Sequence, residues 1–244
     1  MKSIYSVEYK KDLVFDLHLP EGNNFDLFVY FHGGGLEKGS RRGVEVFAEP
    51  LAERGIAVAS VEYRMYPDAK FPDFIEDCAE SVRFLRDYVG QYGNCRRIFV
   101  GGSSAGGYLS MMLCFDKRYF EAVGMKPTDI AGYIHDAGQP TAHFNVLKME
   151  GEDSRRVIVD ERAPMYFVGM DAEYSPMLFI VSDEDMFARY EQTLLMVKTL
   201  EHFGHKENVY LSLQHSKHCK YVFKRDDDGE SVFAKIVLSF IDKL

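Results

Sequence analysis

Short apolar runs alternate along this chain with segments of helical periodicity, a pattern that few architectures accommodate. Runs with the length and apolar content of buried strands occur at residues 25–31, 56–61, 97–100, 130–134, 177–181 and 209–213. Segments with helical spacing of apolar residues occur at 44–54, 73–89, 108–115, 189–203 and 231–244. This alternation predicts an α/β fold with a mostly parallel central sheet and helices on both of its faces.

The length of 244 residues suits a single domain spanning residues 1–244, and no repeat or linker divides the chain. One stretch, residues 136–175, is irregular although it lies between two expected strands. Because loops of that length in a compact domain are usually functional, we expect a small lid or a pocket-forming insertion there.

Charge and cysteine content limit the classes of partner and compartment. A formal net charge of −9 argues against a nucleic-acid partner, since such proteins present a concentrated basic face. No run has the length of a signal peptide's apolar core at the N-terminus, and none approaches a membrane span. The cysteines are scattered, as is typical of reduced thiols, at Cys78, Cys95, Cys114 and Cys219. We therefore expect a cytoplasmic protein without a membrane span.

A glycine cluster follows the expected strand at 97–100 and contains the pattern Gly102-x-Ser104-x-Gly106. Between a strand and a helix this pattern is typical of a nucleophile elbow, in which small neighbours let a strained serine turn project from the sheet. The alternatives are a structural glycine turn and a phosphate-binding loop. A phosphate loop usually has a lysine after its last glycine, where this chain has Tyr108. Ser104 is therefore the candidate nucleophile.

A second glycine run, His32-Gly33-Gly34-Gly35, follows the expected strand at 25–31. Consecutive glycines let the backbone bring its N–H groups against a substrate oxygen, and this histidine-glycine motif forms the oxyanion hole of lipases and esterases. A plain glycine turn is the alternative reading. The two motifs stand in the expected order, about seventy residues apart, which favours a serine hydrolase.

With both motifs present, the chain resembles the hormone-sensitive-lipase-like and related bacterial carboxylesterases of the α/β-hydrolase superfamily, from about residue 13 to the C-terminus. The segment Glu62-Tyr63-Arg64-Met65-Tyr66-Pro67, followed by Phe71-Pro72 and Asp77, is similar to a segment of that group. The resemblance implies a serine esterase without a cofactor. It also implies oxyanion donors and substrate-binding positions around the two glycine motifs. The oxyanion donors are Gly34, Gly35 and Ala105, and the substrate-binding positions are His32, Gly33, Leu36 and Ser103.

Two features depart from that group. The long N-terminal cap has no room here, because the first sheet strands begin almost at Met1. Leu36 stands where an aromatic residue usually follows the glycine run. A neighbouring group, the kynurenine formamidases, usually carries tryptophan at that position, and this chain contains no tryptophan. The missing tryptophan counts against a kynurenine formamidase, although amide cleavage remains an open alternative.

The chain order in this superfamily is serine, then acid, then histidine. Asp183, Glu184 and Asp185 all follow the expected strand at 177–181. The family pattern, with a small residue after the strand and the acid three positions later, selects Asp185.

Two histidines, His215 and His218, follow the expected strand at 209–213. In the family a short polar loop precedes the histidine and an aromatic residue follows it, so Tyr221 favours His218. Cys219 beside these histidines suggests a metal site, but the second ligand pair of a closed zinc site is missing. Residues 226–229 lack the twelve-residue loop of a calcium site. We expect neither a metal nor a cofactor.

These residues predict a serine carboxylesterase that acts on short-acyl, acetyl-type esters through Ser104, His218 and Asp185. The irregular stretch would supply a shallow acyl wall from Gln139, Pro140, His143, Phe144, Pro164, Met165, Tyr166 and Phe167. One alternative is an aryl formamidase or another amide hydrolase of this fold. Another is a non-catalytic α/β-hydrolase-fold binding protein. The expected partner is a small-molecule ester, and the expected oligomeric state is a monomer or homodimer.

Overall fold

Apolar strands that are buried on both faces form the centre of a parallel sheet. In the computed structural model, which describes residues 1–244, eight strands have the order β1-β2-β4-β3-β5-β6-β7-β8. Six neighbouring strands pair in parallel: β3 (Asn24–Phe31), β4 (Ile56–Val61), β5 (Asn94–Ser103), β6 (Gly132–Asp136), β7 (Met177–Glu184) and β8 (Val209–Lys217). The predicted α/β fold class is confirmed.

The antiparallel edge of the sheet is an N-terminal hairpin of β1 (Lys2–Lys10) and β2 (Leu13–Leu19), and β2 also pairs antiparallel with β4. Asp12 adopts a positive φ of 64° in the two-residue turn between the strands, a conformation that aspartate tolerates better than most residues. The hairpin therefore begins the sheet almost at Met1, as the sequence indicates.

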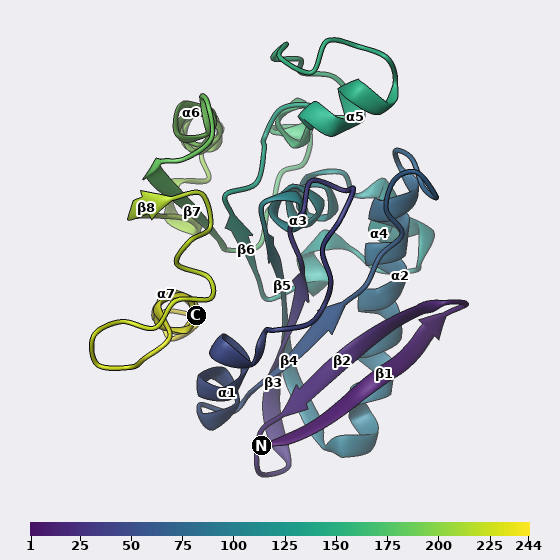
Figure 1. Cartoon of the computed structure of the whole chain (residues 1–244), viewed down its shortest axis with the longest axis vertical. Coiled ribbons are helices and arrows are strands. Elements are labelled where there is room, and N and C mark those ends of the chain that lie inside the picture. Colours follow the sequence, from purple (N-terminus) through teal and green to yellow (C-terminus); the bar gives the residue numbers. More distant parts are fainter.

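Alternation along the strands divides the core into two layers. Leu27, Val29 and Phe31 of β3 join one cluster, whereas Phe28 and Tyr30 join the other, because successive side chains point to opposite faces. The first cluster includes residues of α2 (Asp73–Tyr88), α3 (Ala105–Phe115) and α6 (Arg189–His202), and the second includes residues of α1 (Glu45–Glu53) and α7 (Val232–Ile241). Figure 1 shows α1 and α7 on one side of the sheet and α2 on the other.

Short helices complete the layers: α4 (Arg118–Ala122), α5 (Phe144–Met149), η1 (Val89–Tyr92), η2 (Pro127–Asp129), η3 (Pro164–Phe167) and η4 (Lys206–Asn208). None of the helices combines the length and the apolar character that crossing a membrane requires.

Several element boundaries differ from the sequence expectation. The helix expected from Tyr108 begins at Ala105, since glycines lower helix propensity but are needed where α3 meets the end of β3. The last helix begins after Ser231, whose hydroxyl accepts a hydrogen bond from the N–H of Ala234 at 3.3 Å, and it ends at Ile241. The last strand continues to Lys217 rather than ending at Leu213.

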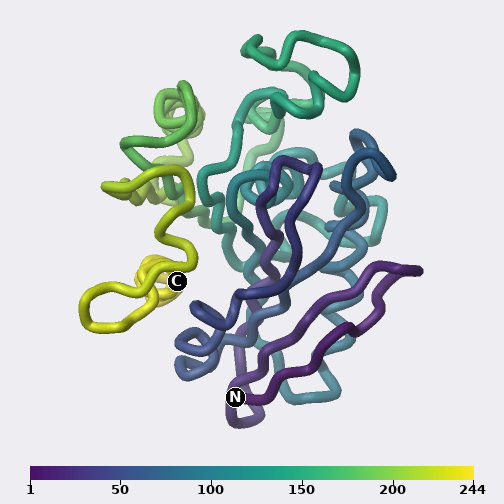
Figure 2. Tube along the Cα trace, in the orientation of Figure 1, coloured from purple at the N-terminus to yellow at the C-terminus, as the bar shows by residue number.

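Residues 136–175 form an excursion with structure of its own, which extends beyond the sheet at the top of the tube in Figure 2. The N–H of Ala142 donates to the carbonyl of Ile158, and the N–H of Met165 donates to that of Pro140, each at 2.9 Å. Arg162 contacts carboxylates of the same segment, Glu150, Glu152 and Asp160. The excursion is therefore held together internally as well as packed on the sheet.

Candidate active site

The turn between β5 and α3 holds Ser104 in a strained backbone conformation, with φ 57° and ψ −114°. Its N–H donates to the carbonyl of Asp136 at 2.8 Å, which ties the turn to the end of β6. A Cβ on Gly102 would lie 2.4 Å from the carbonyl oxygen of Phe31, and one on Gly106 would lie 1.9 Å from it. Only glycine at these two positions lets α3 start so close to β3.

The structure brings Ser104, His218 and Asp185 together from the ends of three strands. His218 directly follows β8, and its Nε2 lies 2.8 Å from Oγ of Ser104. Its Nδ1 lies 2.5 Å from Oδ1 of Asp185, which directly follows β7. The side chain of His218 keeps part of its surface exposed, and that of Asp185 is buried. This is the geometry in which an imidazole can take a proton from a hydroxyl while a carboxylate orients it.

Hydrogen bonds keep Asp185 ionised despite its burial. Burial is the largest single influence and favours the protonated form, but the contact with His218 and the N–H groups of Met186 and Ser182 together outweigh it, so the pKa of Asp185 lies below its ordinary value. The N–H of Met186 donates to Oδ1 at 2.7 Å, and that of Ser182 donates to Oδ2 at 3.3 Å.

The other candidates for the acid and the base lie together on the outside of the same loops. Asp183 and His215 contact each other, with Oδ2 and Nδ1 2.7 Å apart, and the His215 side chain is 86% exposed. Glu184 is also exposed. None of these three has a hydrogen bond to Ser104, so the structure joins only Asp185 and His218 to it.

The glycine loop after β3 lies against the serine turn. A Cβ on Gly33 would lie 3.1 Å from Cβ of Ser104. The N–H groups of Gly34 and Gly35 have no hydrogen-bond acceptor within the chain, and Ala105 opens α3, where N–H groups precede the helical ladder. Nδ2 of Asn145 donates to the carbonyl of Gly35 at 2.6 Å and holds the loop in place. Free N–H groups on both sides of Ser104 are suited to receive an oxyanion.

The side chains of His32 and Leu36 do not face the substrate side of this loop, contrary to the sequence expectation. His32 is buried, stacks on Tyr63 with ring centroids 4.5 Å apart, and places Nε2 3.3 Å from Oε2 of Glu62. The hydroxyl of Tyr63 donates to the carbonyl of His32 at 2.8 Å. Leu36 has a positive φ of 64° and a fully buried side chain in the core. Both side chains therefore support the loop from the protein interior.

Ser103 is also hidden rather than substrate-facing. It is 4% exposed, and its Oγ has no hydrogen-bond partner. Beside it, the fully buried carboxyl of Asp136 accepts a hydrogen bond from the hydroxyl of Tyr221. Burial raises the pKa of Asp136 to about 6. The sequence analysis missed this acid, although its place at the end of the strand next to β5 was an available signal.

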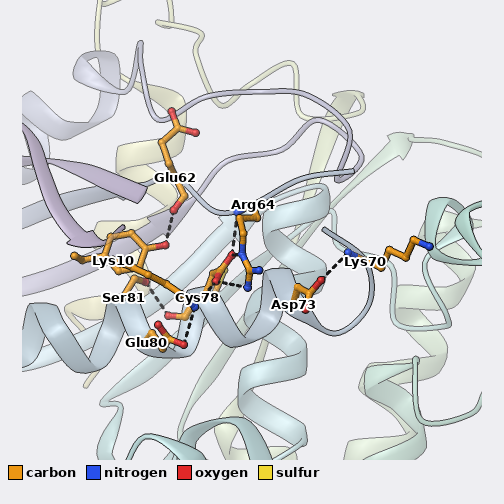
Figure 3. Close-up of polar contacts among 10 residues, drawn as sticks. Lys10, Glu62, Arg64, Lys70, Asp73, Cys78, Glu80 and Ser81 are labelled. Atoms are coloured by element: carbon orange, nitrogen blue, oxygen red, sulfur yellow. Dashed lines mark hydrogen bonds and ion pairs between the residues drawn. The ribbon is translucent and has the colours of Figure 1, made fainter. Parts of the chain in front are cut away.

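The segment after β4 is anchored on α2, and this explains the Glu62-to-Asp77 motif. The fully buried carboxylate of Asp77 accepts hydrogen bonds from Nε and Nη2 of Arg64, each at 2.8 Å, and from Nζ of Lys10 at 2.9 Å. Figure 3 shows Arg64 reaching α2, with Lys10 and Glu80 nearby. These charge-assisted contacts fix the chain directly after Tyr63 and so support His32 indirectly.

A cavity of about 520 Å³ lies beside the acid loop. Gln139 and Phe144 of the excursion line it, as expected for a substrate wall, together with Met186 and Phe187, which the sequence analysis missed. The remaining expected wall residues do not line this cavity. Pro164 and Phe167 are buried, and the buried ring of His143 lies against Tyr108.

The chain matches known proteins over most of its length. The BD-FAE family model matches residues 15–200. A probable isoprenylcysteine alpha-carbonyl methylesterase of Arabidopsis thaliana is 22% identical over 80% of this chain and 46% of its own length. An AB hydrolase superfamily protein of Schizosaccharomyces pombe is 36% identical over 38% of this chain and 28% of its own length. The chain thus spans less than half the length of these two relatives.

Solved structures share the fold. An esterase of Thermogutta terrifontis superposes with a TM-score of 0.76 at 19% identity and covers 98% of this chain and 90% of its own. Further structures of that esterase hold propionate and butyrate. Esterase B of Lactobacillus rhamnosis superposes with a TM-score of 0.78 at 18% identity and covers 99% of this chain and 85% of its own.

Proposed function

Because the chain belongs to the BD-FAE family of α/β-hydrolases, we propose that it is a serine esterase that cleaves carboxylic esters through Ser104, His218 and Asp185. The observation that carries the proposal is the continuous hydrogen-bond series from Oγ of Ser104 through the imidazole to a buried carboxylate. The esterase and methylesterase names of structural neighbours and relatives support ester over amide cleavage.

In the acylation step, Oγ of Ser104 attacks the ester carbonyl while Nε2 of His218 takes the hydroxyl proton. Asp185 holds the proton on Nδ1 and stabilises the imidazolium that forms. The developing oxyanion accepts hydrogen bonds from the N–H groups of Gly34, Gly35 and Ala105. When the tetrahedral intermediate collapses, the C–O bond to the alcohol breaks and His218 returns its proton to the departing oxygen.

In the deacylation step, a water molecule attacks the acyl-serine carbonyl and His218 takes one of its protons. The second tetrahedral intermediate uses the same oxyanion donors. Its collapse breaks the bond to Oγ, returns the proton to Ser104 and releases the carboxylic acid. The loss of one oxyanion donor typically slows such a reaction roughly 100- to 1000-fold.

For the acyl group we propose a short chain of the acetyl type. Residues 1–19 form an edge hairpin of the sheet rather than a wall over the acyl group. The propionate and butyrate held by the Thermogutta terrifontis esterase support this choice. Rates on 4-nitrophenyl acetate, butyrate and octanoate test it, and a maximum at octanoate contradicts it.

The nucleophile is tested by labelling with a fluorophosphonate probe. We expect the wild type to be labelled and Ser104→Ala to lose both labelling and esterase activity. Ser103→Ala is the matched control because its hydroxyl is buried and unbonded, and we expect this variant to retain both. Labelling that persists in Ser104→Ala contradicts the assignment, and hydrolysis of formanilides faster than of aryl acetates would favour amide cleavage.

A further inference from the structure

Arg189, the first residue of α6, is a buried cation without an acidic partner. It is 4% exposed, and no carboxylate lies within ion-pair distance of it. Its guanidinium donates to the carbonyl of Ala137 and, at 3.2 Å, to Oε1 of Gln139. Neutral acceptors do not compensate a buried charge as a carboxylate does, and burial accordingly lowers the pKa of Arg189.

The position of Arg189 adds to this excess of positive charge, because the N-terminal end of a helix carries a partial positive charge of its own. The charge of Asp185 acts on the guanidinium through space. The two carboxylate oxygens of Asp185, however, already accept hydrogen bonds from His218, Met186 and Ser182. The guanidinium of Arg189 therefore still has a positive charge that an anion could neutralise.

The cavity that Arg189 lines has no acidic residue in its wall. Arg155 and Arg156 are its other charged lining residues. They pair with Asp153 and Glu152, which lie outside the lining. In a chain of net charge −9, the wall itself has three arginines and no carboxylate, and Arg189 is the one of the three without an ion-pair partner.

Apolar side chains make up four of the other seven lining residues. Phe187 is 96% exposed and Val157 is 61% exposed, and both line the cavity. Met186 follows Asp185 directly. On the other side Phe144 opens α5, whose Asn145 donates to Gly35 of the glycine loop after β3. In Figure 1, α5 and α6 lie at the same end of the molecule, beyond the carboxyl end of β6.

We propose that this cavity binds a carboxylate group of the substrate, so that the preferred esters carry a negative charge on an apolar or aromatic body. The proposal rests on the esterase function proposed above and names its substrate class. Arg189 supplies the buried charge, Arg155 and Arg156 the rim, and Phe144 and Phe187 the apolar contact.

Matched ester pairs test this. On the alcohol side, 4-acetoxybenzoate is compared with the neutral 4-acetoxybenzamide. On the acyl side, 4-nitrophenyl hemisuccinate is compared with 4-nitrophenyl pentanoate. The readout is the ratio of kcat/KM for the charged ester to that for its neutral partner. We expect Arg189→Gln to lower the ratio about tenfold or more for at least one pair, through KM, with partial recovery in Arg189→Lys.

Since Arg189 also supports the turn at Ala137, a double variant at the exposed rim, Arg155→Gln with Arg156→Gln, provides an independent test that does not disturb the core. We expect it to lower the ratio about threefold and to weaken the salt dependence of the ratio. Arg83→Gln, an exposed change on α2, is the matched control and leaves the ratio unchanged. Ratios that stay at the wild-type value for both pairs in the rim variant overturn the proposal. Failure of the wild type to cleave the neutral esters instead counts against the esterase function.

Discussion

Substitution of Gly106 by alanine tests how the serine turn is positioned. The added Cβ would lie 1.9 Å from the carbonyl oxygen and 2.6 Å from the carbonyl carbon of Phe31, whereas real Cβ contacts are essentially never below 3.0 Å. Both atoms are backbone, so no rotamer change relieves the clash, and α3 must move from β3 by about 1 Å. Ser104 precedes α3, and the glycine loop at residues 33–35 follows β3. The substitution therefore separates the proposed nucleophile from its proposed oxyanion donors.

A misplacement of about 1 Å costs on the order of 100-fold in rate, and overpacking of this kind costs about 1–3 kcal/mol of unfolding free energy. We expect Gly106→Ala to remain folded, to melt several degrees lower, and to lose about 100-fold in kcat/KM on 4-nitrophenyl acetate. Circular dichroism melting and initial rates measure the two effects. Gly90→Ala is the control, since its Cβ meets nothing within 4 Å. Wild-type activity and melting temperature in Gly106→Ala would refute the reasoning.

Two further substitutions test the charges around the site. Asp185→Asn should lower kcat by roughly 10⁴-fold, because His218 loses the carboxylate that orients it. Asp183→Asn changes an exposed pair and should keep kcat within about twofold of the wild type. Equal losses of steady-state rate in the two variants would show that the wrong acid was assigned. Burial raises the pKa of Asp136 to about 6, so the folded chain keeps this proton while the unfolded chain loses it from about pH 4 upward. Stability therefore falls from about pH 4 to about pH 6 and levels off once both states are ionised. Relative to Asp136→Asn, the wild type should lose about 2 kcal/mol of unfolding free energy between pH 4 and pH 7, and urea unfolding that shows a pH-independent difference contradicts this.

The two glycine motifs could be recognised in the sequence because their requirements are local. A strained serine turn needs small residues at Gly102 and Gly106, two positions to either side, and a loop with free N–H groups needs consecutive glycines. Strand and helix alternation is local in the same sense, and from it the fold class followed. Element ends are not local in this sense, since the start of α3 at Ala105 depends on a contact with Phe31 rather than on helix propensity.

The choice between acids and between histidines followed from family spacing, and the structure supplies a physical reason for it. Because β8 continues through Lys217, His215 still lies on the strand and turns outward to Asp183, whereas His218 lies past its end and reaches Ser104.

The inward-facing contacts of the glycine loop and the charge of the cavity could not be predicted from local sequence in this way. Whether His32 faces a substrate or Glu62 depends on a partner thirty positions away, and spacing along the chain contains no such contact. The same holds for the charged cavity, since Arg155 and Arg189 become neighbours only when the excursion folds back beside α6. A motif of a few adjacent residues can be recognised from the sequence, because its geometry depends on those residues alone. Burial, side-chain orientation and the charge of a pocket depend on contacts between distant residues, so only the tertiary structure determines them.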